Sequence, residues 1–223
     1  VGNETKRRAV IVGTNYKNAK GGIPVLEGAE NDALEIYERL SDPNFGNFEI
    51  PENHCLIGDK AKSEDIRRAI SDVFYDTAVS CDLALFYFSG HGFNDKWYRD
   101  LYIAPHDMSM KQPFVRGIKK SELNEVISKS VGSQVKCALV ILDCCYSGLE
   151  TNFKDKSGGV EKTFDEHIRE FSSEAEGLMV IGSSGEEEAS KEIEFPHKDG
   201  TKHQHGAFSS WLIDGLDCLT GSD

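Results

Sequence analysis

Short, fully apolar runs alternate with amphipathic segments along this chain. The runs end at glycine or polar residues, which is typical of strands buried on both faces. They span residues 9–12, 55–57, 83–88, 138–142 and 178–181. Between them, apolar residues recur at helical spacing, with capping or helix-ending residues at the boundaries. Helices are therefore predicted over residues 30–40, 63–74, 121–131, 164–171 and 207–219.

The order of these elements predicts an α/β fold. Strands that alternate with helices form βαβ units, and right-handed crossovers give a mostly parallel central sheet with helices on both faces, a three-layer sandwich. The length fits a single domain over residues 1–223. Two polar stretches, 149–159 and 185–206, are predicted to be loops. Such sheets bind ligands beyond the carboxyl ends of their strands, so functional residues are expected there.

Composition and charge exclude several classes of partner. The formal net charge is -13, and an acidic surface repels nucleic acid and anionic membranes, so neither is expected. No apolar run approaches the roughly 18–20 residues of a membrane span. Six cysteines without a CxxC pair indicate reduced thiols in a cytoplasmic protein. Because the first residue is not Met and residues 216–223 break off abruptly, we expect a longer natural chain, with a regulatory domain or partner beyond this piece.

Two reactive side chains follow directly after predicted strands. His91 lies in Ser89-Gly90-His91-Gly92, and Cys145 lies in Asp143-Cys144-Cys145. A thiol attacks a peptide carbonyl only as the thiolate, and it needs a nearby base to form it. Both residues belong to the same edge of the predicted sheet. Together they predict a Cys–His pair, although each alone would be read as a loop histidine or a buried thiol.

Both motifs resemble those of caspases, and more closely those of metacaspases. His91 stands 54 positions before Cys145 in the motif Asp143-Cys144-Cys145-Tyr146-Ser147-Gly148, near the caspase spacing of about 50. Segments 9–16, 26–32, 103–107 and 206–209 also resemble metacaspase segments, in the same order. The resemblance implies a caspase-like fold and a cysteine endopeptidase that acts through a thioacyl-enzyme intermediate. It makes His91 and Cys145 the catalytic pair and leaves Cys144 to pack as a hydrophobic residue.

The resemblance also implies an oxyanion hole and a specificity pocket. The backbone N–H groups of Gly92 and Cys145 would form the oxyanion hole. Asp32, Ser89 and Asp143 match the pocket residues, although position alone would make Asp32 a solvated charge at a helix start. Two carboxylates in a pocket attract Arg or Lys. Cleavage of protein or peptide substrates after Arg or Lys is therefore expected.

We expect no cofactor, no metal and no dependence on calcium. Many metacaspases bind calcium through several aspartates, and Asp100 matches one of them. Lys119, Lys120 and Asn152 stand where the resemblance implies further acidic ligands, and lysines there would repel the ion. The tract 196–205 is predicted to be a solvated loop rather than a metal site. Its histidines are His197, His203 and His205.

The same resemblance divides the chain into three parts. Residues 1–148 are large-subunit-like, 149–176 form a linker, and 177–223 are small-subunit-like. Caspase-like enzymes are often cut in the linker, whose lysines the expected pocket would accept. Any self-cleavage is therefore expected to fall at Lys154, Lys156 or Lys162, and an uncut single chain is the equal alternative.

Two other functions stay open. A catalytically silent caspase-like interaction module would be marked by the loss of His91 or Cys145, and both are present. A flavodoxin-like or phosphate-binding α/β protein would carry a glycine-rich phosphate loop, and neither GxxxxGK nor GxGxxG opens a predicted helix. A peptidase assay with an Arg substrate separates the three.

Overall fold

The computed structural model describes residues 5–76, 80–95, 100–146, 164–183, 192–196 and 202–219. Its strands are β1 (Arg7–Gly13), β2 (Cys55–Ile57), β3 (Cys81–Asp95), β4 (Asp100–Ile103), β5 (Ile118–Lys119), β6 (Val135–Tyr146), β7 (Leu178–Gly182), β8 (Glu192–Pro196) and β9 (Lys202–Gly206). Its α-helices are α1 (Ala29–Ser41), α2 (Ser63–Phe74), α3 (Pro113–Arg116), α4 (Lys120–Ser130), α5 (Phe164–Ser173) and α6 (Ala207–Leu219). Two 3₁₀ helices are η1 (Glu52–His54) and η2 (Gly58–Lys60).

The central sheet is mostly parallel. Parallel strands run in the order β2–β1–β3–β6–β7, while β4 and β5 add antiparallel pairs beside the end of β3. The chain leaves β1 toward β2 on one side and later returns to β3 on the other, so the strand order reverses between β1 and β3. Open α/β sheets bind ligands beyond the carboxyl ends of the strands at such a reversal. The predicted α/β fold is thus confirmed.

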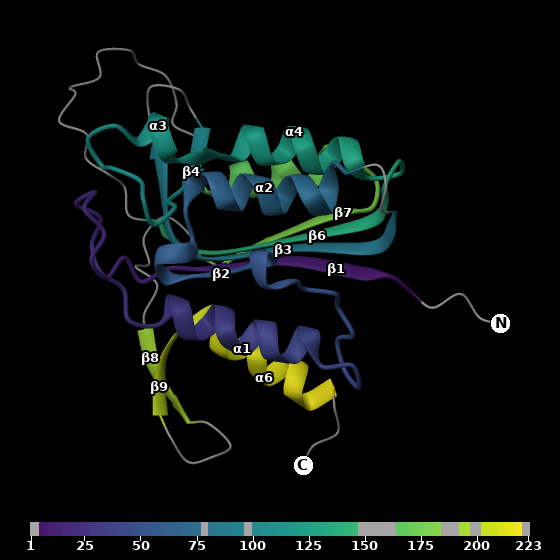
Figure 1. Ribbon diagram of the computed structural model, residues 1–223, viewed down its shortest axis with the longest axis horizontal. Coiled ribbons are helices and arrows are strands. Elements are labelled where there is room, and N and C mark those ends of the chain that lie inside the picture. Colours follow the sequence, from purple (N-terminus) through teal and green to yellow (C-terminus); the bar gives the residue numbers. More distant parts are fainter. Residues whose placement is uncertain are drawn as a thin grey trace.

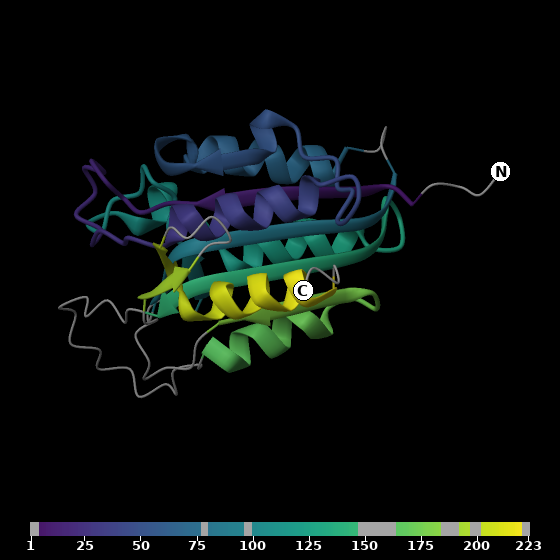
Figure 2. The ribbon, with the colours of Figure 1, turned by 90° about the horizontal axis from the view of Figure 1, so that it is seen from below.

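Helices cover both faces of the sheet, as Figures 1 and 2 show: α2, α4 and α5 lie on one face, and α1 and α6 on the other. Alternate residues of β1 point to opposite faces of the sheet and pack in the two hydrophobic cores there. Val10 and Val12 pack with the core under α2, α4 and α5, whereas Ala9 and Ile11 pack with the core under α1 and α6. None of the helices that the structure describes is long and apolar enough to cross a membrane.

The junction of β1 and α1 is tightly built. A Cβ atom on Gly13 would lie 2.4 Å from Cβ of Ala33 and 2.5 Å from the carbonyl oxygen of Ala29, so only glycine fits there. Asn15 then caps the helix from the loop: its Oδ1 accepts the N–H of Glu30 at 3.1 Å, and the Glu30 carboxylate accepts the N–H of Asn15 at 3.0 Å. These contacts fix Asp32, in the first turn of α1, near the carboxyl ends of the strands.

The prediction of a loop over 185–206 is wrong in part. Strands β8 and β9 form an antiparallel hairpin, and the side chain of Asn31 donates to the carbonyl oxygen of Gln204 at 3.0 Å. Figure 1 shows this hairpin beside the start of α1. Neither strand of the hairpin contains a continuous apolar run, which is the pattern by which the other strands were predicted. Since α6 starts directly after β9, the hairpin also sets where α6 begins.

Candidate active site

His91 is held firmly at the carboxyl end of the sheet. It lies in the part of β3 that extends beyond the predicted apolar run, and it is 7% exposed. Its backbone N–H donates to the hydroxyl of Tyr16 at 2.8 Å, and its ring lies 5.1 Å from the ring of Tyr16, centre to centre. Its Nε2 lies 3.0 Å from the carbonyl oxygen of Pro24. Because a carbonyl can only accept, Nε2 carries the proton, and Nδ1 holds the lone pair when the ring is neutral.

His91 and Cys145 occupy paired positions of neighbouring strands. The parallel register of β3 and β6 places Gly90 opposite Cys144 and His91 opposite Cys145. Adjacent strands lie about 4.8 Å apart, and paired positions share one face of the sheet. Cys144 is 1% exposed and packs in the core under α2, α4 and α5, as predicted. The side chain of Cys145 lies outside the described residues.

Gly92 continues the same edge of the sheet. It pairs with Ile103 in β4 and with Tyr146 in β6. A Cβ atom on this residue would lie 3.1 Å from Cβ of Cys144, so a larger residue would press on the strand that carries the two cysteines. The structure thus brings the predicted catalytic pair and the predicted oxyanion residue to one edge at the backbone level.

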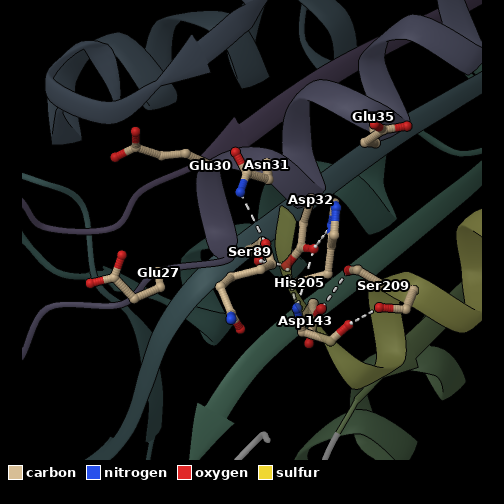
Figure 3. Close-up of polar contacts among 12 residues, drawn as sticks. Glu27, Glu30, Asn31, Asp32, Glu35, Ser89, Asp143, His205 and Ser209 are labelled. Carbon is tan, nitrogen blue, oxygen red and sulfur yellow. Dashed lines mark hydrogen bonds and ion pairs between the residues drawn. The ribbon is translucent and has the colours of Figure 1, made fainter. Parts of the chain in front are cut away.

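The three predicted pocket residues also converge, from α1, β3 and β6 (Figure 3). Asp32 is 1% exposed, Ser89 3% and Asp143 5%. The hydroxyl of Ser89 donates to Oδ2 of Asp32 at 3.1 Å. Asp143 accepts a hydrogen bond from the hydroxyl of Ser209, which lies at the start of α6. Asp32 is therefore a buried acceptor, and the alternative of a solvated charge at a helix start is wrong.

Burial perturbs both carboxyl groups. It raises the pKa of Asp32 to about 6, aided by the neighbouring charge of Asp143 and opposed by hydrogen bonds from His205 and Gly206. Burial likewise raises the pKa of Asp143, against a hydrogen bond from Ser209. A buried pair of carboxylates with raised pKa values is typical of a functional site. Above about pH 6 the carboxyl group of Asp32 is mostly ionised.

His205 is the residue of this cluster whose place the sequence did not indicate. It was expected in a solvated loop, but it is fully buried, and its Nδ1 lies 2.7 Å from Oδ1 of Asp32. The expectation of a solvated loop is wrong here because β9 docks against α1, which removes the ring from water. The ring's partner lies 173 positions away in the chain. His203 is exposed, as expected, and His197 lies outside the described residues.

The region that the resemblance relates to calcium contains an internal ion pair. Nζ of Lys120 lies 3.2 Å from the carboxylate of Glu170, and Lys120 is 9% exposed. Asp100 accepts hydrogen bonds from the backbone of Leu101, at 2.9 Å, and from the hydroxyl of Ser121. Within the described residues, no group of three or more His, Cys, Asp or Glu side chains is placed to hold a metal ion. Calcium independence itself stays a prediction.

Some predicted residues lie outside the part of the chain that the structure describes. They are Asn152 and the expected cleavage sites Lys154, Lys156 and Lys162. Two contributors to the site gave no usable signal in the sequence. The carbonyl of Pro24 is a backbone group, and Tyr16, which contacts His91, has a backbone φ of 60°. Such a conformation is uncommon for a bulky residue and follows from the loop as a whole.

Comparisons with known proteins agree with this geometry. The profile of the family described as Caspase domain matches residues 6–219. Metacaspase-2 of Arabidopsis thaliana is 29% identical over 153 residues, which cover 64% of this chain but only 35% of that protein. The crystal structure of protein GSU0716 from Geobacter sulfurreducens superimposes with a TM-score of 0.58 at 15% identity, over 96% of this chain and 82% of that chain, which shows a shared fold. The chain therefore belongs to the caspase-domain family of cysteine peptidases.

Proposed function

We propose that this protein is a cysteine endopeptidase that cleaves peptide bonds after Arg or Lys, with Cys145 as nucleophile and His91 as base. The observation that carries the proposal is the β3–β6 register, which pairs His91 with Cys145 at the carboxyl ends of the strands. The hydrogen bond from Nε2 to Pro24 adds to it, because it leaves Nδ1 as the basic atom of His91. The family match and the likeness to Metacaspase-2 support this assignment.

The chemistry follows from these positions. Nδ1 of His91 takes the proton of the Cys145 thiol, and the thiolate attacks the carbonyl carbon of the scissile bond. The N–H groups of Gly92 and Cys145 stabilise the resulting oxyanion. His91 then passes the proton to the leaving amine, and a thioacyl-enzyme remains. Water attacks this ester, and the acid product and the free thiol are released.

The buried carboxylates supply the proposed specificity. Asp32 and Asp143 place negative charge where burial excludes water, so the Arg or Lys side chain before the scissile bond gains a strong electrostatic interaction. An Asp side chain would instead meet like charge. Ser89 holds Asp32 in place through its hydroxyl. Bidentate pairing favours Arg over Lys.

Further parts of the proposal concern the setting of the reaction. Several free cysteines are typical of a reducing compartment, and we propose the cytoplasm. The chain spans about a third of the length of Metacaspase-2, and we propose that regulation of proteolysis involves a domain or partner outside this piece. The division into a large-subunit-like part (1–148), a linker (149–176) and a small-subunit-like part (177–223) stays a prediction.

The test is a fluorogenic peptide panel with Arg, Lys or Asp before the scissile bond. Wild-type protein should cleave the Arg and Lys peptides and leave the Asp peptide intact, and Cys145→Ala should cleave none. A profile dominated by Asp would refute the specificity. Equal cleavage by Cys145→Ala would refute the assignment of the nucleophile. A wild-type protein without any peptidase activity would favour the silent interaction module.

A further inference from the structure

His205 sits at a junction between parts of the chain that are far apart in sequence. It is the last residue but one of β9, with Gly206 between it and the start of α6, and it is fully buried. A Cβ atom on Gly28 would lie 2.9 Å from the Cα atom of His205, so the backbone of β9 lies directly on the start of α1. His203, two positions earlier in the same strand, is exposed. The strand therefore turns one histidine inward against α1 and leaves the other at the surface.

The ring of His205 completes the hydrogen bonding of Asp32. Because an ionised carboxylate only accepts, Nδ1 of His205 donates to Oδ1 across 2.7 Å. The backbone N–H of Gly206 lies 3.2 Å from Oδ1 and 3.1 Å from Oδ2, and the hydroxyl of Ser89 donates to Oδ2. A carboxylate that is 1% exposed stays ionised only when donors replace the water that it has lost. The imidazole is the one ionisable donor in this set.

A second carboxylate makes that donor necessary. A Cβ atom on Gly206 would lie 3.0 Å from Oδ2 of Asp143 and 3.2 Å from Oδ2 of Asp32, so this glycine lies between the two acids. The phenol of Tyr87, in β3, lies 2.6 Å from the hydroxyl of Ser209, and both acids oppose its ionisation. The charge of Asp143 disfavours the charged form of Asp32, and the hydrogen bond from His205 favours it.

We propose that His205 is a specificity-determining residue of the pocket, which acts by holding Asp32 ionised and in a fixed orientation beside Asp143, so that the two carboxylates together bind the cationic side chain of the substrate. This inference rests on the proposed function and names a residue through which that function selects its substrate. His205 is a positioning residue, since it acts through Asp32. Its removal leaves two buried carboxylates without this donor, and Asp32 then keeps its proton to a higher pH.

Isosteric variants separate hydrogen bonding from packing. The side-chain nitrogen of Asn occupies nearly the place of Nδ1 in His, whereas that of Gln lies nearer the place of Nε2. His205→Asn should therefore keep the contact with Asp32, and His205→Gln and His205→Ala should lose it. We expect His205→Gln to raise KM for an Arg peptide about tenfold at pH 7 with little change in kcat. For His205→Asn we expect a KM within about threefold of the wild-type value. For His203→Ala we expect the wild-type KM.

The experiment measures two properties of each variant between pH 6 and pH 9. One is the KM and kcat for the Arg peptide, and the other is the binding of agmatine, a guanidinium compound, by calorimetry in a Cys145→Ala background. His205→Gln should bind agmatine about tenfold more weakly at pH 7 and recover toward pH 9. Thermal unfolding reports whether each variant is folded. If Ala at this position unfolds the protein, the comparison of Asn with Gln decides.

The outcomes distinguish this inference from the function on which it rests. Equal KM values and equal agmatine affinities for the Asn and Gln variants would overturn the role of His205, even if the wild-type protein cleaves after Arg. The role would also be overturned if His205→Gln lowered kcat alone, or if it weakened the binding of substrate and agmatine equally at every pH. Agmatine binding that depends on His205, in a protein that cleaves no peptide, would overturn the peptidase assignment and support the pocket.

Discussion

Replacing Tyr16 with Phe tests how His91 is positioned. The hydroxyl of Tyr16, a residue 1% exposed, donates to the carbonyl oxygen of Ala104 and accepts the backbone N–H of His91, each at 2.8 Å. Tyr16→Phe removes both hydrogen bonds and leaves a buried donor and a buried acceptor without this partner. At about 1–3 kcal/mol for such a group, and with partial relaxation, we expect about 2–3 kcal/mol of destabilisation. For a chain of this length that lowers Tm by about 5–10 °C.

The same change should slow catalysis more than it weakens binding. Displacement of a catalytic group by about 1 Å can cost roughly a hundredfold in rate, and we expect kcat for an Arg peptide to fall ten- to a hundredfold. KM should change less than threefold, because this hydroxyl binds the backbone of Ala104 and His91 and acts on the position of the base. Calorimetry and steady-state kinetics measure the two effects, with Tyr37→Phe, half-buried on α1, as the control. A lowered Tm with unchanged kcat would refute the positioning role, and a change confined to KM would place Tyr16 in the pocket instead.

Three further predictions concern binding, calcium and processing. Because burial raises the pKa of Asp32 to about 6, this group takes up a proton as pH falls, and agmatine binding to Cys145→Ala should weaken about tenfold from pH 7 to pH 5; affinity that is constant over this range would contradict it. Lys120 already pairs with Glu170, so a chelator should leave peptidase activity unchanged, and restoration of lost activity by micromolar calcium would contradict this. Any self-cleavage should fall at Lys154, Lys156 or Lys162, be seen by intact mass, and be absent from Cys145→Ala; equal cutting of both proteins would point to a contaminating protease.

Local pattern was enough to predict the five parallel strands of the sheet, because strands buried on both faces are continuously apolar, but it missed the antiparallel strands β4 and β5. The run 138–142 lies inside β6, and 9–12 lies inside β1. The ends were harder to predict, since β3 and β6 continue through polar residues that carry the site. These polar ends form strands because they pair with a neighbouring strand, and a local sequence pattern carries no information about that neighbour. Placing His91 and Cys145 on one edge followed from the general rule for parallel sheets, and the register pairs them directly.

Long-range polar contacts were beyond the reach of local pattern. The ring of His205 and the carboxylate of Asp32 are 173 positions apart, and a histidine in a charged tract is indistinguishable from a solvated one until β9 docks on α1. The hairpin of β8 and β9 was missed for the same reason. Hydrogen bonds such as that from Asn31 to Gln204 link its second strand to α1. The carbonyl group of Pro24 has no residue-type signature at all.

The central claim, that Cys145 is the nucleophile activated by His91, is tested most directly by mapping an Arg-directed chloromethyl ketone. The thiolate displaces chloride from this reagent, so a stable thioether marks the reactive cysteine. Intact mass and peptide mapping of wild-type protein should show one label, on Cys145, that is absent from Cys145→Ala and strongly slowed in His91→Ala. Cys144→Ala should be labelled as wild type is. A label on Cys144 with Cys145 unmodified, or labelling that does not depend on His91, would contradict the account.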